Sequence, residues 1–218
     1  MSVQVSAAAL APTQCSKTEN NRWPANFHPD VWGDYFLSCA SNVKLKEEVR
    51  QILLLAMSEK PATKLDLIDS VQHLGVSYHF EKEIDEILQQ VQTIHSNCCD
   101  QEDSDNLYSS SLRFRLLRQH GYRISCDMFE KFKDNQGNFK ESLTYDVRGM
   151  LSLHEATHLR VHGEDILEEA LAFTTTHLQS VAATSASSLS KQISHALRQS
   201  LHKNLPRLEA NRYIRSCQ

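Results

Sequence analysis

The spacing of apolar residues is the feature that most constrains how this chain can fold. In seven successive stretches, apolar side chains recur every three or four residues, which places them along one face of a helix. These stretches span residues 44–58, 63–74, 81–95, 107–120, 144–159, 164–179 and 189–202. No segment shows a competing strand pattern, and most links between the stretches are short, which favours antiparallel neighbours. The sequence therefore predicts an all-α domain of antiparallel helices.

Glycine and proline are scarce and fall mainly between these stretches. The 218 residues include 6 glycines and 5 prolines, fewer than the turns of an all-β fold require. We expect Gly75 and Gly121 to end helices. Pro61 is expected to break the first helix, Thr63 to cap the second, and Pro206 to mark the exit from the last. The side chains expected to face the core are Leu45, Val49, Ile52, Leu53, Ala56, Leu65, Ile68, Val71, Leu74, Ile84, Ile87, Leu88, Val91, Ile94, Val147, Leu151, Leu159, Ile166, Ala170 and Phe173.

Composition excludes several classes of partner. The net charge is −4 and no Lys/Arg-rich run occurs, so we expect no nucleic-acid partner. The longest apolar stretch, residues 52–57, is far too short to cross a bilayer, so we expect no membrane partner. The 6 cysteines show neither zinc-finger spacing nor a secreted disulfide framework, which favours reduced thiols in a cytoplasmic protein.

Two segments precede the predicted helices. Residues 1–21 are small and polar and lack the features of a secretory signal or an Arg-rich transit peptide, so we expect a disordered leader. Residues 22–41 are rich in aromatics and contain two prolines that prevent a regular helix. We interpret them as a strap that packs its rings on a helical surface.

One short motif suggests a zinc peptidase. Residues 154–158 match H-E-x-x-H, in which His154 and His158 share a helix face and Glu155 activates a metal-bound water. His162 lies almost on the same line, and three histidines on one straight helix are poorly placed for a tetrahedral ion. We therefore interpret the segment as a half-exposed helix with polar histidines and keep a zinc peptidase as a remote alternative.

Six runs along the chain, taken in order, resemble plant terpene synthases and are closest to the angiosperm sesquiterpene synthase group. They span residues 23–37, 74–84, 112–122, 129–134, 162–167 and 205–210. The resemblance implies that residues 42–214 form the family's N-terminal domain, an α/α barrel of antiparallel helices. It also implies the family reaction, the Mg²⁺-dependent ionisation and cyclisation of farnesyl diphosphate or a related prenyl diphosphate.

The resemblance also supplies one candidate site in the strap. The family's entry motif is two arginines, eight residues and a tryptophan; Arg22 and Trp32 match it, whereas Trp23 replaces the second arginine. In family members this strap covers the active site of the C-terminal domain and helps to exclude water. Arg22 and Trp32 are therefore the residues that the resemblance assigns to an active-site cap.

The family's metal-binding motifs have no counterpart in this sequence. The aspartate-rich helix and the second metal motif belong to a C-terminal catalytic domain, and this chain contains no adjacent Asp–Asp pair. Arg113 and Arg115 resemble the family's diphosphate-binding R-x-R, but that motif also belongs to the C-terminal domain, so we interpret them as ion-pairing residues within the barrel.

We accordingly expect no catalytic and no metal-binding residue in this chain. Mg²⁺ is expected to serve the full-length family, and a prenyl diphosphate substrate is expected only where a catalytic domain is supplied. The match ends at Ile214, so residues 215–218 are expected to be a divergent tail and the chain a truncated synthase that is inactive alone. The alternative is a non-catalytic protein that docks on full-length synthases.

Overall fold

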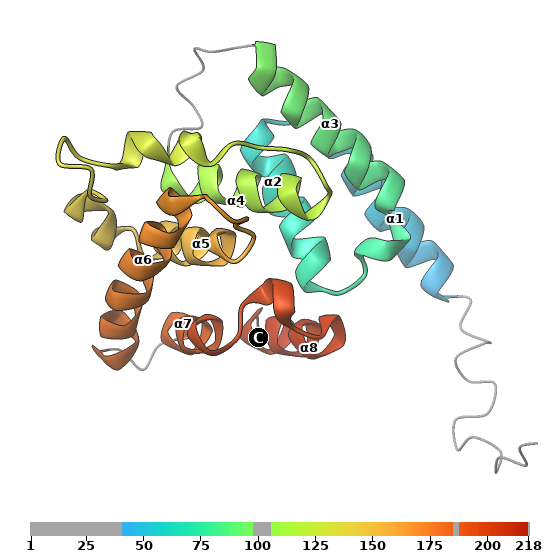
Figure 1. The fold of residues 1–218 in the computed structure, drawn as a ribbon. Helices are drawn as coiled ribbons and strands as arrows, with labels where there is room; N and C mark the ends of the chain where they lie inside the picture. Colours follow the sequence, from blue (N-terminus) through green and yellow to red (C-terminus); the bar gives the residue numbers. More distant parts are fainter. Residues whose placement is uncertain (1–40, 98–105, 185–187, 218) are drawn as a thin grey trace, which may run out of the picture. The chain divides into compact units, whose positions relative to one another are not determined.

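The computed structural model describes residues 41–97, 106–184 and 188–217, and these residues are almost entirely helical (Figure 1). The α-helices are α1 (Ser41–Ala56), α2 (Pro61–His73), α3 (Glu81–Asn97), α4 (Leu107–Gln119), α5 (Val147–Thr157), α6 (Asp165–Thr184), α7 (Ser188–Arg198) and α8 (Pro206–Cys217). Short 3-10 helices are η1 (Ser77–His79), η3 (Cys126–Phe132), η4 (Glu141–Tyr145) and η5 (Leu201–Lys203). Within the described residues the only strand-like feature is an isolated bridge between Lys133 and Phe139. The all-α prediction is confirmed.

Several predictions concern residues outside the described part of the chain. They are the leader over residues 1–21, the strap up to residue 40 with Arg22 and Trp32, and the inward side chain of Ile94. The expected boundary at residue 214 falls inside α8, which continues to Cys217. None of the described helices is long and apolar enough to cross a membrane.

The ends of three helices follow the sequence signals, whereas the predicted start of α2 is wrong. Gly75 and Gly121 adopt positive φ angles of 68° and 82° directly after α2 and α4, as expected for helix ends. Helix α1 ends at Ala56, before Pro61, as expected. The expected cap at Thr63 is wrong, because α2 already begins at Pro61 after Lys60, and a proline at the first helical position loses no hydrogen bond.

A proline near the C-terminal end also begins a helix that was not predicted. Pro206 was expected to mark the exit from the last helix, yet it is the first residue of α8. The helix predicted over residues 144–159 is also shorter than expected, since η4 precedes it and Asp146 caps α5 by accepting a hydrogen bond from the Gly149 N–H at 2.8 Å.

The apolar core consists of two clusters that share α4. One cluster lies among α1, α2, α3 and one side of α4, and the other lies among η3, α5, α6, α7 and the opposite side of α4. Leu112, Leu116 and Leu117 of α4 belong to the first cluster, whereas Leu107 and Phe114 belong to the second. Helix α4 is thus apolar on two faces, as expected for the central element of the domain.

The predicted inward face of α1 is wrong for two residues. Leu45 and Ile52 are 56% and 51% exposed, whereas Leu53 and Ala56 are buried as predicted. The reason is that, among the described residues, α1 packs mainly against α2 and α3, so a narrow stripe of the helix is covered. Leu74, also predicted to be inside, is 39% exposed at the end of α2.

The inward face of α5 is rotated from the predicted one. Leu151 was expected inside and is only half-buried, while Met150 and Leu153 are fully buried. This rotation follows from the two neighbours of α5, because α4 and α6 pack against it from different directions.

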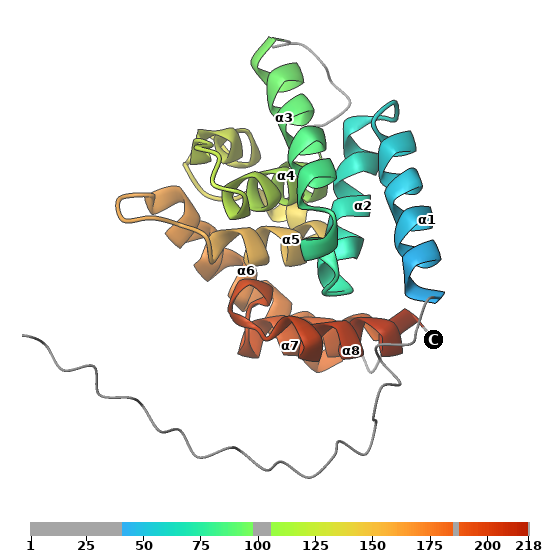
Figure 2. The same cartoon turned by 90° about the vertical axis from the view of Figure 1, so that its right-hand side faces the viewer.

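Helices α7 and α8 form a layer beneath the ends of the other helices (Figure 2). Consecutive helices from α4 to α7 pack against one another, and α8 returns to contact α2. At that contact a Cβ on Gly75 would lie 3.2 Å from the Pro206 carbonyl oxygen, so the close approach of α8 to the end of α2 favours glycine. The space enclosed by α2, α4, α5, α7 and α8 holds the candidate site.

Candidate functional site

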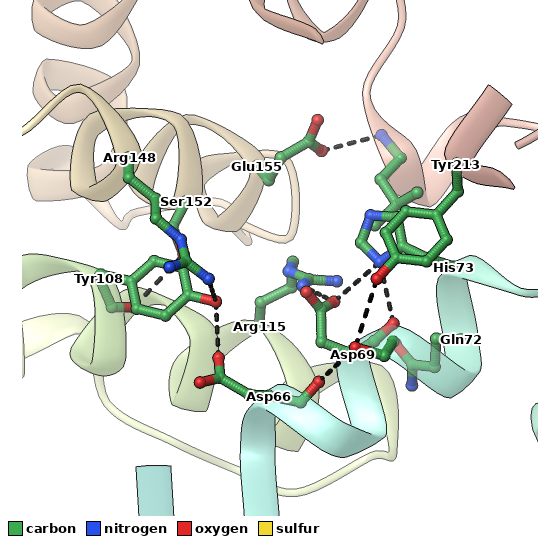
Figure 3. Close-up of polar contacts among 12 residues, drawn as sticks. Asp66, Asp69, Gln72, His73, Tyr108, Arg115, Arg148, Ser152, Glu155 and Tyr213 are labelled. Atoms are coloured by element: carbon green, nitrogen blue, oxygen red, sulfur yellow. Dashed lines mark hydrogen bonds and ion pairs between the residues drawn. The ribbon is translucent and has the colours of Figure 1, made fainter. Parts of the chain in front are cut away.

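A cavity of about 680 Å³ opens between α2, α4, α5, α7 and α8. Its lining combines leucines with many polar and charged side chains, several of which contact one another (Figure 3). This volume lies within the range of roughly 300–1,000 Å³ that is typical of small-molecule pockets. The cavity is therefore the candidate site of the described residues.

The floor of the cavity is an ion pair between Asp69 of α2 and Arg115 of α4. Nη2 of Arg115 donates a hydrogen bond to Oδ1 of Asp69, and the Arg115 side chain is 4% exposed. His73 lies one turn beyond Asp69, with Nδ1 3.2 Å from the same carboxylate oxygen. Burial alone raises the pKa of Asp69, but the charges of Arg115 and His73 more than offset burial and hold this pKa well below its usual range.

His73 is correspondingly favoured in its charged form. Burial lowers the pKa of His73, but the hydrogen bond and charge of Asp69 outweigh burial and leave the pKa raised. The ring of His73 also packs against that of Tyr213 from α8, with centroids 5.0 Å apart. Tyr213 donates a weak hydrogen bond of 3.4 Å to the Ser70 hydroxyl, so α8 is joined to α2 at this side of the cavity.

Tyr108 of α4 forms a second polar cluster on the opposite side of Arg115 (Figure 3). Its hydroxyl donates to Asp66 Oδ1 at 2.7 Å and accepts from Arg148 Nη2 at 3.0 Å. The Arg148 guanidinium also stacks over the Tyr108 ring at 4.2 Å from its centroid. Burial and the hydrogen bond to Asp66 raise the pKa of Tyr108, so the phenol stays protonated.

Glu155 of α5 faces this floor from above (Figure 3). Its Oε2 accepts a hydrogen bond of 2.8 Å from the backbone N–H of Leu201, which ties α5 to η5. Burial raises the pKa of Glu155 to about 7, against the smaller opposing effects of that hydrogen bond and of Arg115. Glu155 thus changes its charge near neutral pH.

Helices α7 and α8 form another wall of the cavity. His195 of α7 lies 3.1 Å from Glu209 Oε2 of α8, and the Asn204 amide donates to the same oxygen at 2.5 Å. The Arg212 guanidinium approaches the His195 ring and lies 3.8 Å from Glu209. These contacts hold α7 and α8 together and occupy the Glu209 carboxylate.

The carboxylates of the cavity are poorly suited to a metal ion. Asp66 accepts a hydrogen bond from the Tyr108 hydroxyl, and Asp69 is paired with Arg115. Both acids of α2 are therefore already bound to other side chains. Over residues 41–97, 106–184 and 188–217, no group of three or more His, Cys, Asp or Glu side chains is placed to hold a metal. The described residues therefore do not fit the Mg²⁺ that the resemblance implies.

The H-E-x-x-H residues do not form a zinc site in the described part of the chain. Nε2 of His154 lies 3.4 Å from Nε2 of His158, as the spacing predicts, but α5 ends at Thr157 and His162 is exposed beyond it. His154 is buried at 3% exposure, rather than half-exposed as expected, and its Nδ1 lies 3.2 Å from the Thr174 hydroxyl of α6.

The charge state of the two histidines fits a structural role. Burial lowers the pKa of His154, and burial together with the charge of His154 lowers that of His158 to about 4. Both rings are therefore neutral at neutral pH, and His154 joins α5 to α6 through its contact with Thr174. Glu155 does not face them as a general base, since its carboxylate is held at Leu201.

Sequence reasoning identified only part of this site. The interpretation of Arg115 as an ion-pairing residue is confirmed by its contact with Asp69. Asp69, Tyr108 and Glu155 were not recognised as one cluster, because they lie on three helices. The available signal was Asp69 itself, an acid beside Ile68 within the apolar stripe of α2, where an unpaired charge would be costly.

Most of this chain matches known proteins in sequence. A family model described as "Terpene synthase, N-terminal domain" matches residues 25–197. A (−)-germacrene D synthase of Vitis vinifera is 56% identical over 226 residues, covering 98% of this chain and 40% of that protein. A (+)-delta-cadinene synthase isozyme XC1 of Gossypium arboreum is 48% identical, covering 98% of this chain and 39% of that protein. The chain thus spans about two-fifths of the length of these curated relatives.

The fold of this chain is also similar to that of a solved terpene synthase structure. The crystal structure of isoprene synthase from grey poplar leaves (Populus x canescens), in complex with three Mg²⁺ ions and dimethylallyl-S-thiolodiphosphate, superimposes with a TM-score of 0.73. Sequence identity in that superposition is 34%, and it covers 85% of this chain and 36% of that one.

Proposed function

Because this chain belongs to the terpene synthase family, we propose that its helices form the N-terminal α-barrel domain of an enzyme in the plant sesquiterpene synthase group. The reaction of such an enzyme is the Mg²⁺-dependent ionisation and cyclisation of farnesyl diphosphate or a related prenyl diphosphate. The observation that carries this proposal is the agreement between the matched segment, residues 25–197, and the helical domain that the described residues form.

We propose further that a polypeptide of these 218 residues has no synthase activity by itself. Ionisation of an allylic diphosphate requires clustered carboxylates that hold Mg²⁺ against the leaving group, and the sequence contains no adjacent aspartate pair. The acids of the cavity are also engaged with Arg115, His73 and Tyr108. The barrel then acts as the scaffold that supports a catalytic domain and presents the strap to it.

Arg22 and Trp32 carry the proposed capping role of the strap. A guanidinium and an indole placed over the mouth of the catalytic domain exclude water, which otherwise quenches a carbocation to an alcohol. Trp23, which replaces the second arginine of the motif, supplies no charge there, so Arg22 alone is expected to form the ionic contact of the cap. The cytosolic location indicated by the sequence is part of the same proposal.

A chimera tests this proposal. Residues 1–218 replace the matching segment of the Vitis vinifera (−)-germacrene D synthase, and products from farnesyl diphosphate with Mg²⁺ are analysed by gas chromatography. We expect the chimera to make sesquiterpene hydrocarbon. Arg22→Ala and Trp32→Ala should each increase the fraction of alcohol, whereas Arg123→Gln, an exposed change near η3, should not. A folded chimera whose product ratio is insensitive to both strap changes would contradict the capping role.

A further inference from the structure

Arg115 is buried more completely than its contacts explain. Its side chain is 4% exposed, and Nη2 is bound to Asp69. Its Nε and Nη1 are also buried, yet neither has a hydrogen-bond partner among the described residues. An unmet guanidinium donor in a protein interior is costly, and Arg115 is one of the residues that line the cavity, so a ligand bound there is placed to accept from these donors.

Three of the four acids that line the cavity are bound to other side chains. The fourth, Glu155, is held at the Leu201 N–H, and burial favours its protonated form. Asp69 is shared between Arg115 and His73, and Asp66 accepts from Tyr108. Glu209 is held by His195, Asn204 and Arg212 on the far wall. None of these carboxylates is therefore available to bind the remaining Arg115 donors, and an external oxyanion has the chemistry that completes the site.

Further cations line the outer part of the cavity. Arg148, Lys191, Arg212 and Arg215 all contribute to its lining and are exposed to solvent. They come from α5, α7 and α8, so they surround the opening instead of forming one stripe along a single helix. Cations around an opening attract an anion towards it and guide it inward.

Apolar side chains occupy the rest of the lining. Leu112, Leu151, Leu189 and Leu201 contribute from α4, α5, α7 and η5. The volume of about 680 Å³ is larger than an inorganic anion needs. The ligand that suits both parts of the cavity has an anionic head and an apolar body.

We propose that this cavity binds a small organic oxyanion, a phosphate ester or a carboxylate, with its head on Nε and Nη1 of Arg115 and its apolar part against the leucines. Such a site gives the helical domain a binding function of its own.

Glu155 of α5 lines the cavity above Arg115 (Figure 3). When protonated it donates a hydrogen bond to an oxyanion, and when ionised it repels one. Because burial raises its pKa to about 7, binding of a carboxylate ligand, whose own charge is constant in this range, is expected to weaken as the pH rises from 6 to 8. His73, whose pKa is raised, and His195 also line the cavity, so Glu155→Gln is needed to isolate the contribution of Glu155.

The test is calorimetry and NMR titration of the 218-residue chain with hexyl phosphate, hexanoate, inorganic phosphate and 1-hexanol. We expect a dissociation constant of about 1 mM or tighter for hexyl phosphate or hexanoate. Inorganic phosphate, which lacks the apolar part, and 1-hexanol, which lacks the charge, should each bind at least about tenfold more weakly. A preference between hexyl phosphate and hexanoate identifies the head group.

Variants localise the site. Arg115→Lys keeps the ion pair with Asp69 but loses the guanidinium fork, and should weaken hexyl phosphate about tenfold. The double change Asp69→Asn with Arg115→Met removes both buried charges together and should abolish binding. Glu155→Gln should strengthen binding at pH 8 and flatten its pH dependence.

Arg215→Gln should weaken binding, while Arg207→Gln, also exposed on α8 but outside the cavity lining, should not. Circular dichroism and thermal melting establish whether each variant is folded. If the double variant is unfolded, the binding affinities of Arg115→Lys, Arg215→Gln and Glu155→Gln test the proposal. Equal affinity of wild type and Arg115→Lys, equal binding of hexanol and hexyl phosphate, or no binding of either anion at millimolar concentration would overturn the proposal.

Discussion

The buried carboxyl of Glu155 makes the stability of this domain depend on pH in a defined direction. Its pKa is about 7 in the folded protein and 4.5 when unperturbed, and each pKa unit corresponds to about 1.4 kcal/mol. Between these two values the native state keeps a proton that the unfolded chain has released. Stability therefore falls as pH rises through this window, by roughly 3 kcal/mol in total, and then levels off.

Glu155→Gln isolates this effect. Glutamine has the same shape and keeps an oxygen that accepts from the Leu201 N–H, but it does not ionise. The variant should match the wild type near pH 4.5 and exceed it by about 3 kcal/mol at pH 8. Other titrating groups contribute to both proteins, so their effects cancel in the difference.

The assay is urea denaturation of both proteins between pH 4.5 and 8, followed by circular dichroism and analysed by linear extrapolation. Glu86→Gln, an exposed change on α3, is the matched control and should follow the wild type at every pH. A difference between Glu155→Gln and wild type that stays constant across this range would refute the reasoning, because it would show that Glu155 is ionised in the native state throughout.

Three further predictions concern the floor, the core and the histidines. Asp69→Asn leaves the buried Arg115 charge without its partner and should cost about 3 kcal/mol of unfolding free energy in denaturant titration; an unchanged midpoint would contradict a buried ion pair. Phe114→Ala, at 0% exposure in the second cluster, should cost about 4 kcal/mol, whereas Leu55→Ala, at 71% exposure, should change stability by less than about 0.5 kcal/mol. Wild type and His158→Ala should both purify without stoichiometric zinc; one zinc per chain that is lost in the variant would establish the metal site.

The helices were predictable because their signals are local. Periodic apolar residues located α2, α3, α4 and α6, and the glycines at positions 75 and 121 ended two helices where expected. The start of α2 was misplaced and α8 was missed because proline is compatible with the first turn of a helix as well as with its interruption. Pro61 and Pro206 follow the helices they were expected to end, and each also begins the next helix.

The cavity was not predictable because it depends on tertiary packing. Asp69, Arg115 and Glu155 lie on three helices, and their approach depends on how α4 is held between α2 and α5. The return of α8 to α2, which encloses the cavity, was missed together with α8 itself. The prediction that Leu45 and Ile52 of α1 are buried was wrong for a similar reason. Periodicity indicates which face of a helix is apolar but not how much of that face a neighbouring helix covers.

Product analysis of the 218-residue polypeptide tests most directly whether this helical domain supports, rather than performs, the chemistry of its family. The purified chain is incubated with farnesyl diphosphate and Mg²⁺, alongside the chimera as a positive control. We predict no sesquiterpene above the background of a protein-free sample, and hydrocarbon from the chimera. A specific sesquiterpene from the isolated chain would contradict this division of roles and would require metal-binding carboxylates within these residues.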